Sequence, residues 1–215
     1  MNVLSIRRLV KTLTAVFLMT TALGSPAATW VVDSTSASPG LSSCTAAAND
    51  CSFPGAVSRL GSTGDSITFT VASSDATEVF IAKDVVIEAA GARLLRLVIS
   101  TSVGWATVTV RNAVWQYINS GSPFGGAMYI APSQIVTIED SQFLFNRTGN
   151  TGKGGAIHNF GILTVRRSRF EGNHSPQGAG AIYHGVSPSP NPSSLTVLDS
   201  VFRANGVLDP TGPSR

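Results

Sequence analysis

The sequence is poor in charged residues and contains only three histidines and two cysteines. Charged side chains make up 13% of the chain and form no basic stripe interleaved with aromatic residues, so nucleic-acid binding is not expected. No histidine lies near Cys44 and Cys51, which argues against a zinc site. Beyond residue 28 no segment keeps a helical period, and this excludes helix bundles and sheets joined by crossover helices. We expect no cofactor.

The sequence does contain a repeat. Four segments alternate apolar residues with a polar residue and end in an aromatic anchor, at residues 108–115, 136–143, 163–170 and 195–202. The anchors lie 28, 27 and 32 residues apart. Alternation with a period of two indicates β-strands, and a repeat of this length indicates stacked coils. A second strand per coil is expected at residues 125–129, 154–158 and 179–183, where small residues allow sharp bends.

Stacked coils would align equivalent side chains. We expect Phe143, Phe170 and Phe202 to pile up inside the coils above Trp115. An Asn follows each Phe at a fixed offset, so Asn146, Asn173 and Asn205 are predicted to form an amide ladder at a turn. Ser141, Ser168 and Ser200 lie in register as well. The fold class is therefore all-β, a parallel solenoid with a small N-terminal cap.

The repeat is similar to one found in a known family. Residues 154–157, Gly-Gly-Ala-Ile, with the Ser-x-Phe-x-x-Asn pattern of residues 168–173, resemble the repeat of the polymorphic outer membrane proteins of bacteria. The resemblance covers about residues 105–206. Residues 30–69 resemble the CSLREA segment that precedes such repeats in secreted proteins, although Phe-Pro-Gly-Ala stands at 53–56 in place of Leu-Arg-Glu-Ala.

The resemblance implies a right-handed, single-stranded parallel β-helix that is secreted or displayed on a cell surface. Adhesive or structural roles are implied more often than catalysis.

The N-terminus is typical of a secretory signal peptide. Arg7, Arg8 and Lys11 precede a short apolar core at 13–23 and small residues up to about 28. We expect export by the Sec route to the extracellular space, cell surface or outer membrane, with no transmembrane span in the mature chain. The alternative is an N-terminal membrane anchor, although the apolar stretch is short. Without residues 1–28 the chain has twelve basic and twelve acidic residues, so its high pI reflects the signal.

Two regions are predicted after the signal. Residues 29–75 form the cap, in which Cys44 and Cys51 are expected to pair as a disulfide and Pro54 to open a short helix. Residues 76–215 form the β-helix. No helix is expected to cover the last coil, so we expect a chain truncated at its C-terminal end, a minimal lid, or end-to-end pairing with a partner at the open edge.

Candidate chemistry is sparse. Asp140, Arg167 and Asp199 share one slot and are weak catalytic candidates, because Arg167 would oppose the raised carboxyl pKa that a general acid needs. A solvated charge ladder is the simpler interpretation. The three histidines share no slot, so they are expected to be exposed or half-exposed and to bind no metal.

Binding is a further possibility. Thr137, Thr164 and Thr196 would form a flat row of hydroxyl groups, and Tyr129 and Tyr183 offer faces on which a glycan could stack. We expect an adhesive or structural domain without catalysis. The alternative is a carbohydrate-active or glycan-binding β-helix that contacts polysaccharide.

Overall fold

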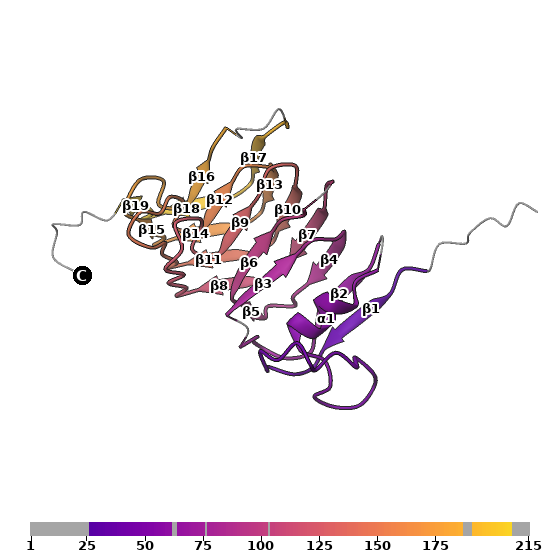
Figure 1. The fold of residues 1–215 in the computed structure, drawn as a ribbon. Helices are drawn as coiled ribbons and strands as arrows, with labels where there is room; N and C mark the ends of the chain where they lie inside the picture. Colours follow the sequence, from indigo (N-terminus) through magenta and orange to yellow (C-terminus); the bar gives the residue numbers. More distant parts are fainter. Residues whose placement is uncertain (1–25, 62–63, 76, 103, 187–190, 208–215) are drawn as a thin grey trace, which may run out of the picture.

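The computed structural model describes residues 26–61, 64–75, 77–102, 104–186 and 191–207. Within this part the chain is built from strands in parallel sheets, with one short helix (Figure 1). Sheet I contains β1 (Thr29–Val32), β2 (Ser66–Phe69), β4 (Val85–Glu88), β7 (Thr107–Arg111), β10 (Ile135–Glu139), β13 (Ile162–Arg166) and β17 (Ser194–Leu198). Sheet II contains β5 (Arg93–Leu94), β8 (Val114–Gln116), β11 (Gln142–Leu144), β14 (Arg169–Glu171) and β18 (Val201–Arg203). Sheet III contains β3 (Glu78–Ile81), β6 (Arg96–Ile99), β9 (Met128–Ile130), β12 (Ile157–Asn159) and β16 (Ile182–His184).

The chain visits the three sheets in rotation. From β7 onward, a strand of sheet I is followed by one of sheet II and then one of sheet III, and each strand pairs in parallel with its equivalent one repeat later. A small pair, β15 (His174–Ser175) and β19 (Gly206–Val207), adds to the corner after sheet II. The prediction of an all-β fold is confirmed: the described chain is mostly strands, and the strands of the three large sheets pair in parallel.

The aromatic anchors stack as predicted. Phe143 pairs with Phe170 and Phe170 with Phe202, with ring centroids 4.5 and 4.7 Å apart and nearly parallel planes. Trp115 continues the stack at 4.4 Å from Phe143 and donates from its Nε1 to the carbonyl oxygen of Leu95. Trp115, Phe143 and Phe170 are fully buried in the centre of the stack, whereas Phe202 on β18 is 45% exposed. Parallel rings at this spacing gain packing energy beyond their burial.

The predicted polar ladders also form. Asn146 Nδ2 donates to Asn173 Oδ1 at 2.9 Å, and Asn173 Nδ2 donates to Asn205 Oδ1 at 2.8 Å. The serine hydroxyls accept from backbone N–H groups one coil earlier, since Ser141 N lies 3.2 Å from Ser168 Oγ. Ser168 N is 3.1 Å from Ser200 Oγ in the same way. Each ladder therefore satisfies backbone groups at a corner, where the sheet hydrogen bonds stop.

Each coil turns at residues with left-handed backbone conformation. One column comprises Asn112, Asp140, Arg167 and Asp199, with φ between 45° and 53°. A second comprises Tyr117, Phe145, Gly172 and Ala204, and a third comprises Gly125, Gly154 and Ala179. At Gly125 and Gly154 the space is also closed, because a Cβ would lie about 2 Å from the carbonyl oxygen of Met128 or Ile157. Glycine is therefore required at these two positions by the close approach of the backbone, whereas Ala179 adopts the same left-handed conformation with a Cβ.

The N-terminal segment joins the stack directly. β1 and β2 extend sheet I, so the predicted cap supplies the first strands of the same sheet. The predicted helix is α1 (Phe53–Arg59), in which Ser52 caps the N-terminus by accepting from Gly55 N and Pro54 lies in the first turn. Phe53 is buried and meets Phe69 of β2 edge to face, at 5.1 Å between ring centroids. The helix thus covers the first coil.

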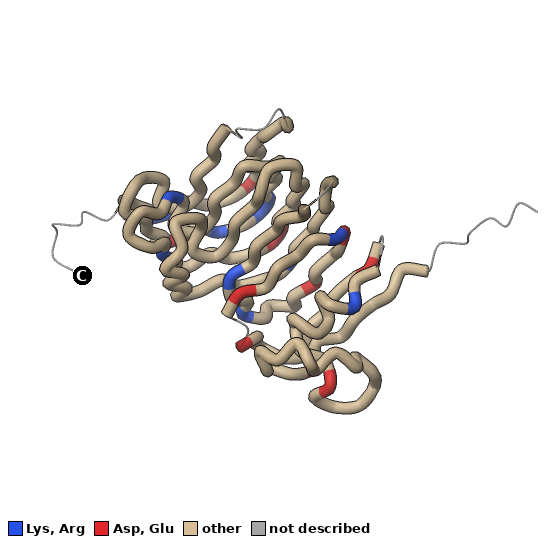
Figure 2. Tube along the Cα trace, in the orientation of Figure 1, with Lys and Arg blue, Asp and Glu red and all other residues tan. Residues whose placement is uncertain are grey.

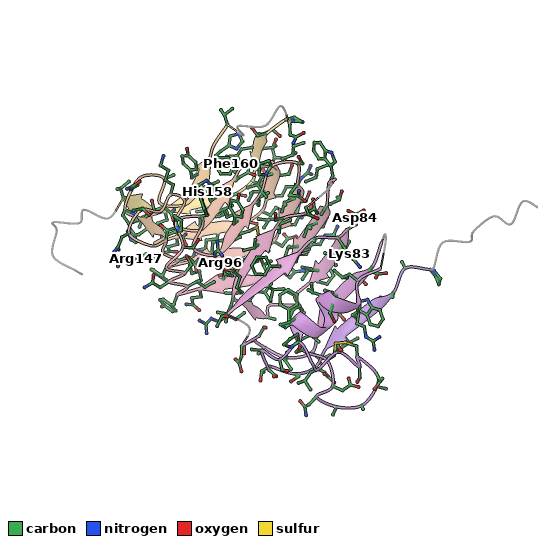
Figure 3. The ribbon with its side chains drawn as sticks, viewed as in Figure 1. Lys83, Asp84, Arg96, Arg147, His158 and Phe160 are labelled. Carbon is green, nitrogen blue, oxygen red and sulfur yellow. A yellow bond between two sulfur atoms is a disulfide. The ribbon has the colours of Figure 1, made fainter. Side chains whose placement is uncertain are left out.

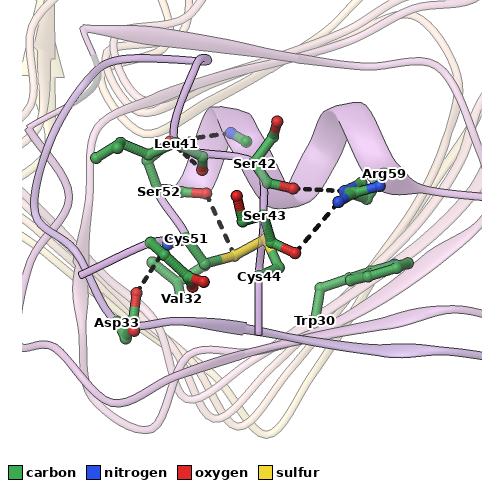
Figure 4. The surroundings of a disulfide bond; sticks show 12 residues. Trp30, Val32, Asp33, Leu41, Ser42, Ser43, Cys44, Cys51, Ser52 and Arg59 are labelled. Atoms are coloured by element: carbon green, nitrogen blue, oxygen red, sulfur yellow. Dashed lines mark hydrogen bonds between the residues drawn. A yellow bond between two sulfur atoms is a disulfide. The ribbon is translucent and has the colours of Figure 1, made fainter. Parts of the chain in front are cut away.

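The predicted disulfide is present. Cys44 and Cys51 are bonded, and the loop that they close, exposed at residues 45–49, lies beside α1 (Figure 4). Arg59 of α1 donates to the carbonyl oxygens of Ser42 and Ser43 and lies 5.6 Å from the ring of Trp30. Asp33 accepts from Cys51 N at 2.9 Å. The loop is therefore attached both to β1 and to α1.

Charges are few on the stack and both signs are intermixed (Figure 2). On the outer face of sheet I, Arg111 bridges Glu88 and Glu139 in the strands on either side, each at 2.7 Å. None of the helices among the described residues is long and apolar enough to cross a membrane. The predicted signal peptide at 1–28 lies largely outside the described residues.

Candidate binding face

The outer face of sheet III carries a column of large side chains. Strand alternation turns Met128 and Ile157 inward and Tyr129 and His158 outward. Pairing in register then places five outward residues in one column, namely Phe80, Val98, Tyr129, His158 and Tyr183. Phe80 is 62% exposed at one end of the column. Tyr129 and Tyr183, predicted as stacking faces, are therefore brought together around His158.

Two further rings from the corners complete a cluster. We call Phe124, Tyr129, His158, Phe160 and Tyr183 the His158 cluster. The imidazole centroid lies 4.7 Å from both Tyr183 and Phe160, 5.1 Å from Phe124 and 6.0 Å from Tyr129. Figure 3 shows His158 and Phe160 side by side in the part of the stack that holds sheet III. Phe124 is 43% exposed, and Tyr183 and Phe160 are half-buried, so the cluster presents aromatic surface to solvent.

His158 itself is only 3% exposed, and the prediction of exposed or half-exposed histidines is wrong for it. The covering rings come from corner residues that lie outside the repeated strands, so the repeat alone gave no sign of this burial. Burial lowers the pKa of His158 to about 4, a shift opposed by its hydrogen bond to the carbonyl of Lys153 and reinforced by the Lys153 charge. The imidazole is therefore neutral at neutral pH.

The hydrogen bonding fixes the imidazole tautomer. His158 Nδ1 lies 3.2 Å from the carbonyl oxygen of Lys153, and because a carbonyl only accepts, Nδ1 carries the proton. Nε2 is then an acceptor, and it is buried without a hydrogen-bond partner among the described residues. A buried acceptor of this kind costs free energy until a donor reaches it. The cluster thus contains an unsatisfied polar atom within an aromatic surface.

Two cations flank the cluster and differ in their pairing. Arg96 is buried, forms an ion pair with Glu78 of the neighbouring strand, and donates to the carbonyl oxygens of Gly125 and Phe124 and to Ser122 Oγ. It thereby holds the loop that carries Phe124. Lys153 lies with its Nζ 4.9 Å from the Tyr183 ring centroid, and none of the ion pairs between described residues involves it.

Burial raises the pKa of Tyr129, and the nearby Arg96 charge acts in the opposite direction. The Tyr129 hydroxyl therefore stays protonated well above neutral pH. The His158 cluster holds no negative charge of its own.

The predicted carboxylate slot lies on a different edge of the stack. Arg167 Nε and Nη2 each donate to one oxygen of Asp140 at 2.8 Å, a two-pronged ion pair. The hydrogen bond from Arg167 holds the pKa of Asp140 below its ordinary value, and Asp140 in turn raises the pKa of Arg167. Asp199 continues the column with the same backbone conformation. The charges of Asp140, Arg167 and Asp199 alternate in sign along the column, as predicted. Asp140 is kept ionised and so cannot act as a general acid.

The predicted threonine row lies on the outer face of sheet I. Thr137 pairs with Thr164 and Thr164 with Thr196, with Thr109 one coil earlier. All four are partly or fully exposed. The row is flanked by the Arg111 ion pairs and contains no aromatic residue among its paired positions, so it offers hydroxyl groups without a stacking surface.

Sequence reasoning did not find a second exposed aromatic pair. Tyr117 and Phe145 stack at 5.3 Å at the corner after sheet II, and they are 64% and 45% exposed. Both follow the aromatic anchor by two residues, a spacing that could have revealed them. The pair lies away from sheet III. Neither Tyr117 nor Phe145 contributes a buried polar atom without a partner, as His158 does with Nε2.

Comparison with protein-family models, with curated proteins and with solved structures finds no match to the chain. The geometry of the described residues is therefore the basis for assigning a function. Those residues contain no group of three or more His, Cys, Asp or Glu side chains placed to hold a metal ion.

Proposed function

We propose that the chain is an exported right-handed, single-stranded parallel β-helix that binds polysaccharide without catalysis and so acts in adhesion. The binding site in this proposal is the His158 cluster on the outer face of sheet III. We also propose that its repeat is of the polymorphic outer membrane protein type and that its N-terminal segment is of the CSLREA type. In this proposal the protein is located at a bacterial cell surface.

The fold proposal is supported by the rotation of successive strands among three parallel sheets in strict register. Connections between parallel strands of one sheet are right-handed in nearly all proteins, because strand twist favours that hand. The internal ladders of Phe143, Phe170 and Phe202 and of Asn146, Asn173 and Asn205 are those a β-helix needs to satisfy its core and turns.

One observation carries the binding proposal, namely the gathering of partly exposed rings in register on sheet III. Tyr129 and Tyr183 lie on either side of His158, and Phe124 and Phe160 widen the surface. Sugar rings present C–H groups on their faces and hydroxyl groups on their edges, so they suit aromatic surfaces with a nearby polar atom. His158 Nε2 is such an atom.

The absence of catalysis in the proposal rests on the carboxylates. Hydrolysis of a glycosidic bond needs two carboxyl groups on either side of it, one of them protonated. The exposed hollow beside Asp140 is lined by Asn112 and Gln142 among others, and Asp140 is the one carboxylate in its described lining. Since Arg167 keeps Asp140 ionised, this edge lacks a general acid.

The test is binding of the purified protein to a panel of polysaccharides by affinity electrophoresis. Retardation by at least one polysaccharide should be lost in Tyr183→Ala. Tyr117→Ala is the matched control, because it removes an exposed ring from another corner. Retardation that persists in Tyr183→Ala and disappears in Tyr117→Ala would move the site to the other corner. No retardation by any polysaccharide would refute the binding proposal, and turnover of one would refute the non-catalytic role.

A further inference from the structure

We propose that the saccharide bound at the His158 cluster is acidic, with a carboxylate on the sugar ring that pairs with Lys153. This inference rests on the proposed polysaccharide-binding function and adds the chemical class of the ligand. It depends on three groups that the fold brings together: an unpaired ammonium, an aromatic face and a bare acceptor nitrogen.

The ammonium is positioned and available. The Lys153 backbone is tied on both sides, since its N–H donates to the carbonyl of Pro123 at 3.2 Å and its own carbonyl accepts from His158 Nδ1. Its Nζ lies 4.9 Å from the Tyr183 centroid and takes part in none of the ion pairs between described residues. The other cation at the cluster, Arg96, is already paired with Glu78.

The charge balance of the cluster favours an anion. The cluster contains no Asp or Glu, because its members are two Tyr, two Phe and one His. Glu78, on the first strand of sheet III, is paired with Arg96. An incoming carboxylate would therefore meet one uncompensated positive charge at the edge of a low-dielectric aromatic surface, where a charge-assisted hydrogen bond is stronger than in water.

The acceptor nitrogen selects a ligand that also carries hydroxyl groups. His158 Nε2 is covered by the neighbouring rings, and Phe124, the most exposed of them, lies between Pro123 and Gly125 on a corner loop. Because Nε2 is buried, a hydroxyl donor reaches it only when one of these rings moves aside. A hydrophobic anion could satisfy Lys153 and Tyr183 but not Nε2, whereas a uronic acid residue offers carboxylate, ring face and hydroxyl together.

The test compares ligands that differ only in charge. Binding of the purified protein is measured by titration calorimetry for polygalacturonate, polymannuronate and polyglucuronate, each beside its methyl ester, with dextran as the neutral reference and dextran sulfate as the sulfated one. The variants are Lys153→Gln and, as a matched control, Arg166→Gln, an exposed cation on the outer face of sheet I.

We expect one uronate to bind at least about tenfold more tightly than its ester. Lys153→Gln should reduce that ratio to about one and leave binding of the ester unchanged, whereas Arg166→Gln should keep the ratio. Equal affinity for acid and ester, a ratio that survives Lys153→Gln, or tighter binding of dextran sulfate than of every uronate would overturn the inference. Binding of esters or dextran alone would overturn it while leaving the polysaccharide-binding proposal in place, and binding of nothing in either panel would remove both.

Discussion

Asn173 Oδ1 accepts two hydrogen bonds from Asn146 at once, one from its Nδ2 at 2.9 Å and one from its backbone N at 3.0 Å. Asn173 Nδ2 meanwhile donates to the carbonyl of Phe143 at 2.8 Å and to Asn205 Oδ1. One buried amide therefore satisfies polar groups in the coils on both sides. The ladder therefore couples successive coils through buried side-chain amides.

Removing one rung of this ladder should be costly. Asn173→Ala leaves Asn146 N without its side-chain acceptor and removes the amide that donates to the Phe143 carbonyl, while Asn146 Nδ2 keeps only the Trp115 carbonyl, so we expect the free energy of unfolding to fall by about 3 kcal/mol. Urea unfolding followed by circular dichroism measures it. Asn119→Ala, an exposed asparagine at the same corner, is the control and should change the free energy by less than about 0.5 kcal/mol. Equal effects would show that the ladder contributes little.

The aromatic stack offers a paired comparison within three residues of chain. Phe143 is fully buried between Trp115 and Phe170, whereas Phe145 is exposed at the corner. Phe143→Ala should lower the free energy of unfolding by about 3–5 kcal/mol, because it leaves a cavity in the centre of the stack. Phe145→Ala should cost under about 1 kcal/mol. Denaturant unfolding of the two variants side by side tests this, and a large loss in Phe145→Ala would mean that the outer pair with Tyr117 supports the corner.

Much of this fold is predictable because stacked coils repeat the same environment. A core position, a ladder position and a bend recur at the same place in each coil, so Phe170, Asn173 and Ser168 reveal their partners by spacing alone. The cap helix is equally local, since Ser52 and Pro54 mark its start. The repeat does not predict that β1 and β2 belong to sheet I, because more than thirty residues connect these two strands and interrupt the period.

The candidate site is less predictable for a related reason. Tyr129, His158 and Tyr183 occupy one slot with differing residues, and periodicity indicates that they are neighbours. It does not indicate that His158 is buried, because the rings that cover it, Phe124 and Phe160, belong to corners of unequal length. Lys153 likewise reaches Tyr183 from a corner loop. The corner residues therefore determine the chemistry of this face, and their sequence differs from one coil to the next.

The disulfide should stabilise the N-terminal end of the protein although the loop that it closes is small. In the chain-entropy model, closing the loop between Cys44 and Cys51 is worth about 2.5 kcal/mol. Cys51 is also fully buried next to α1, so Cys51→Ser should cost more than Cys44→Ser, which removes a half-buried sulfur. Thermal unfolding of the two variants and of the reduced wild type measures this. Identical unfolding of oxidised and reduced protein would contradict the prediction.

The pH dependence of stability should report the buried imidazole. The pKa of His158 in the folded protein is about 4, below its ordinary value of 6.5, so between these values the unfolded chain takes up a proton that the folded protein does not. The free energy of unfolding should therefore be insensitive to His158 above pH 6.5, fall as the pH drops from 6.5 to 4, and level off below, with a loss of at most about 3 kcal/mol.

Because the same slot holds tyrosine in the coils on either side, His158→Tyr should fold and should lack this dependence. His184→Tyr, which changes an exposed histidine on the next strand, should keep it. Urea unfolding from pH 7.5 to 4 for the three proteins isolates the contribution as a difference from wild type, so that acids titrating at lower pH cancel. A wild-type slope matched by His158→Tyr would show that the imidazole is not buried in solution, and with it the aromatic site would lose its polar centre.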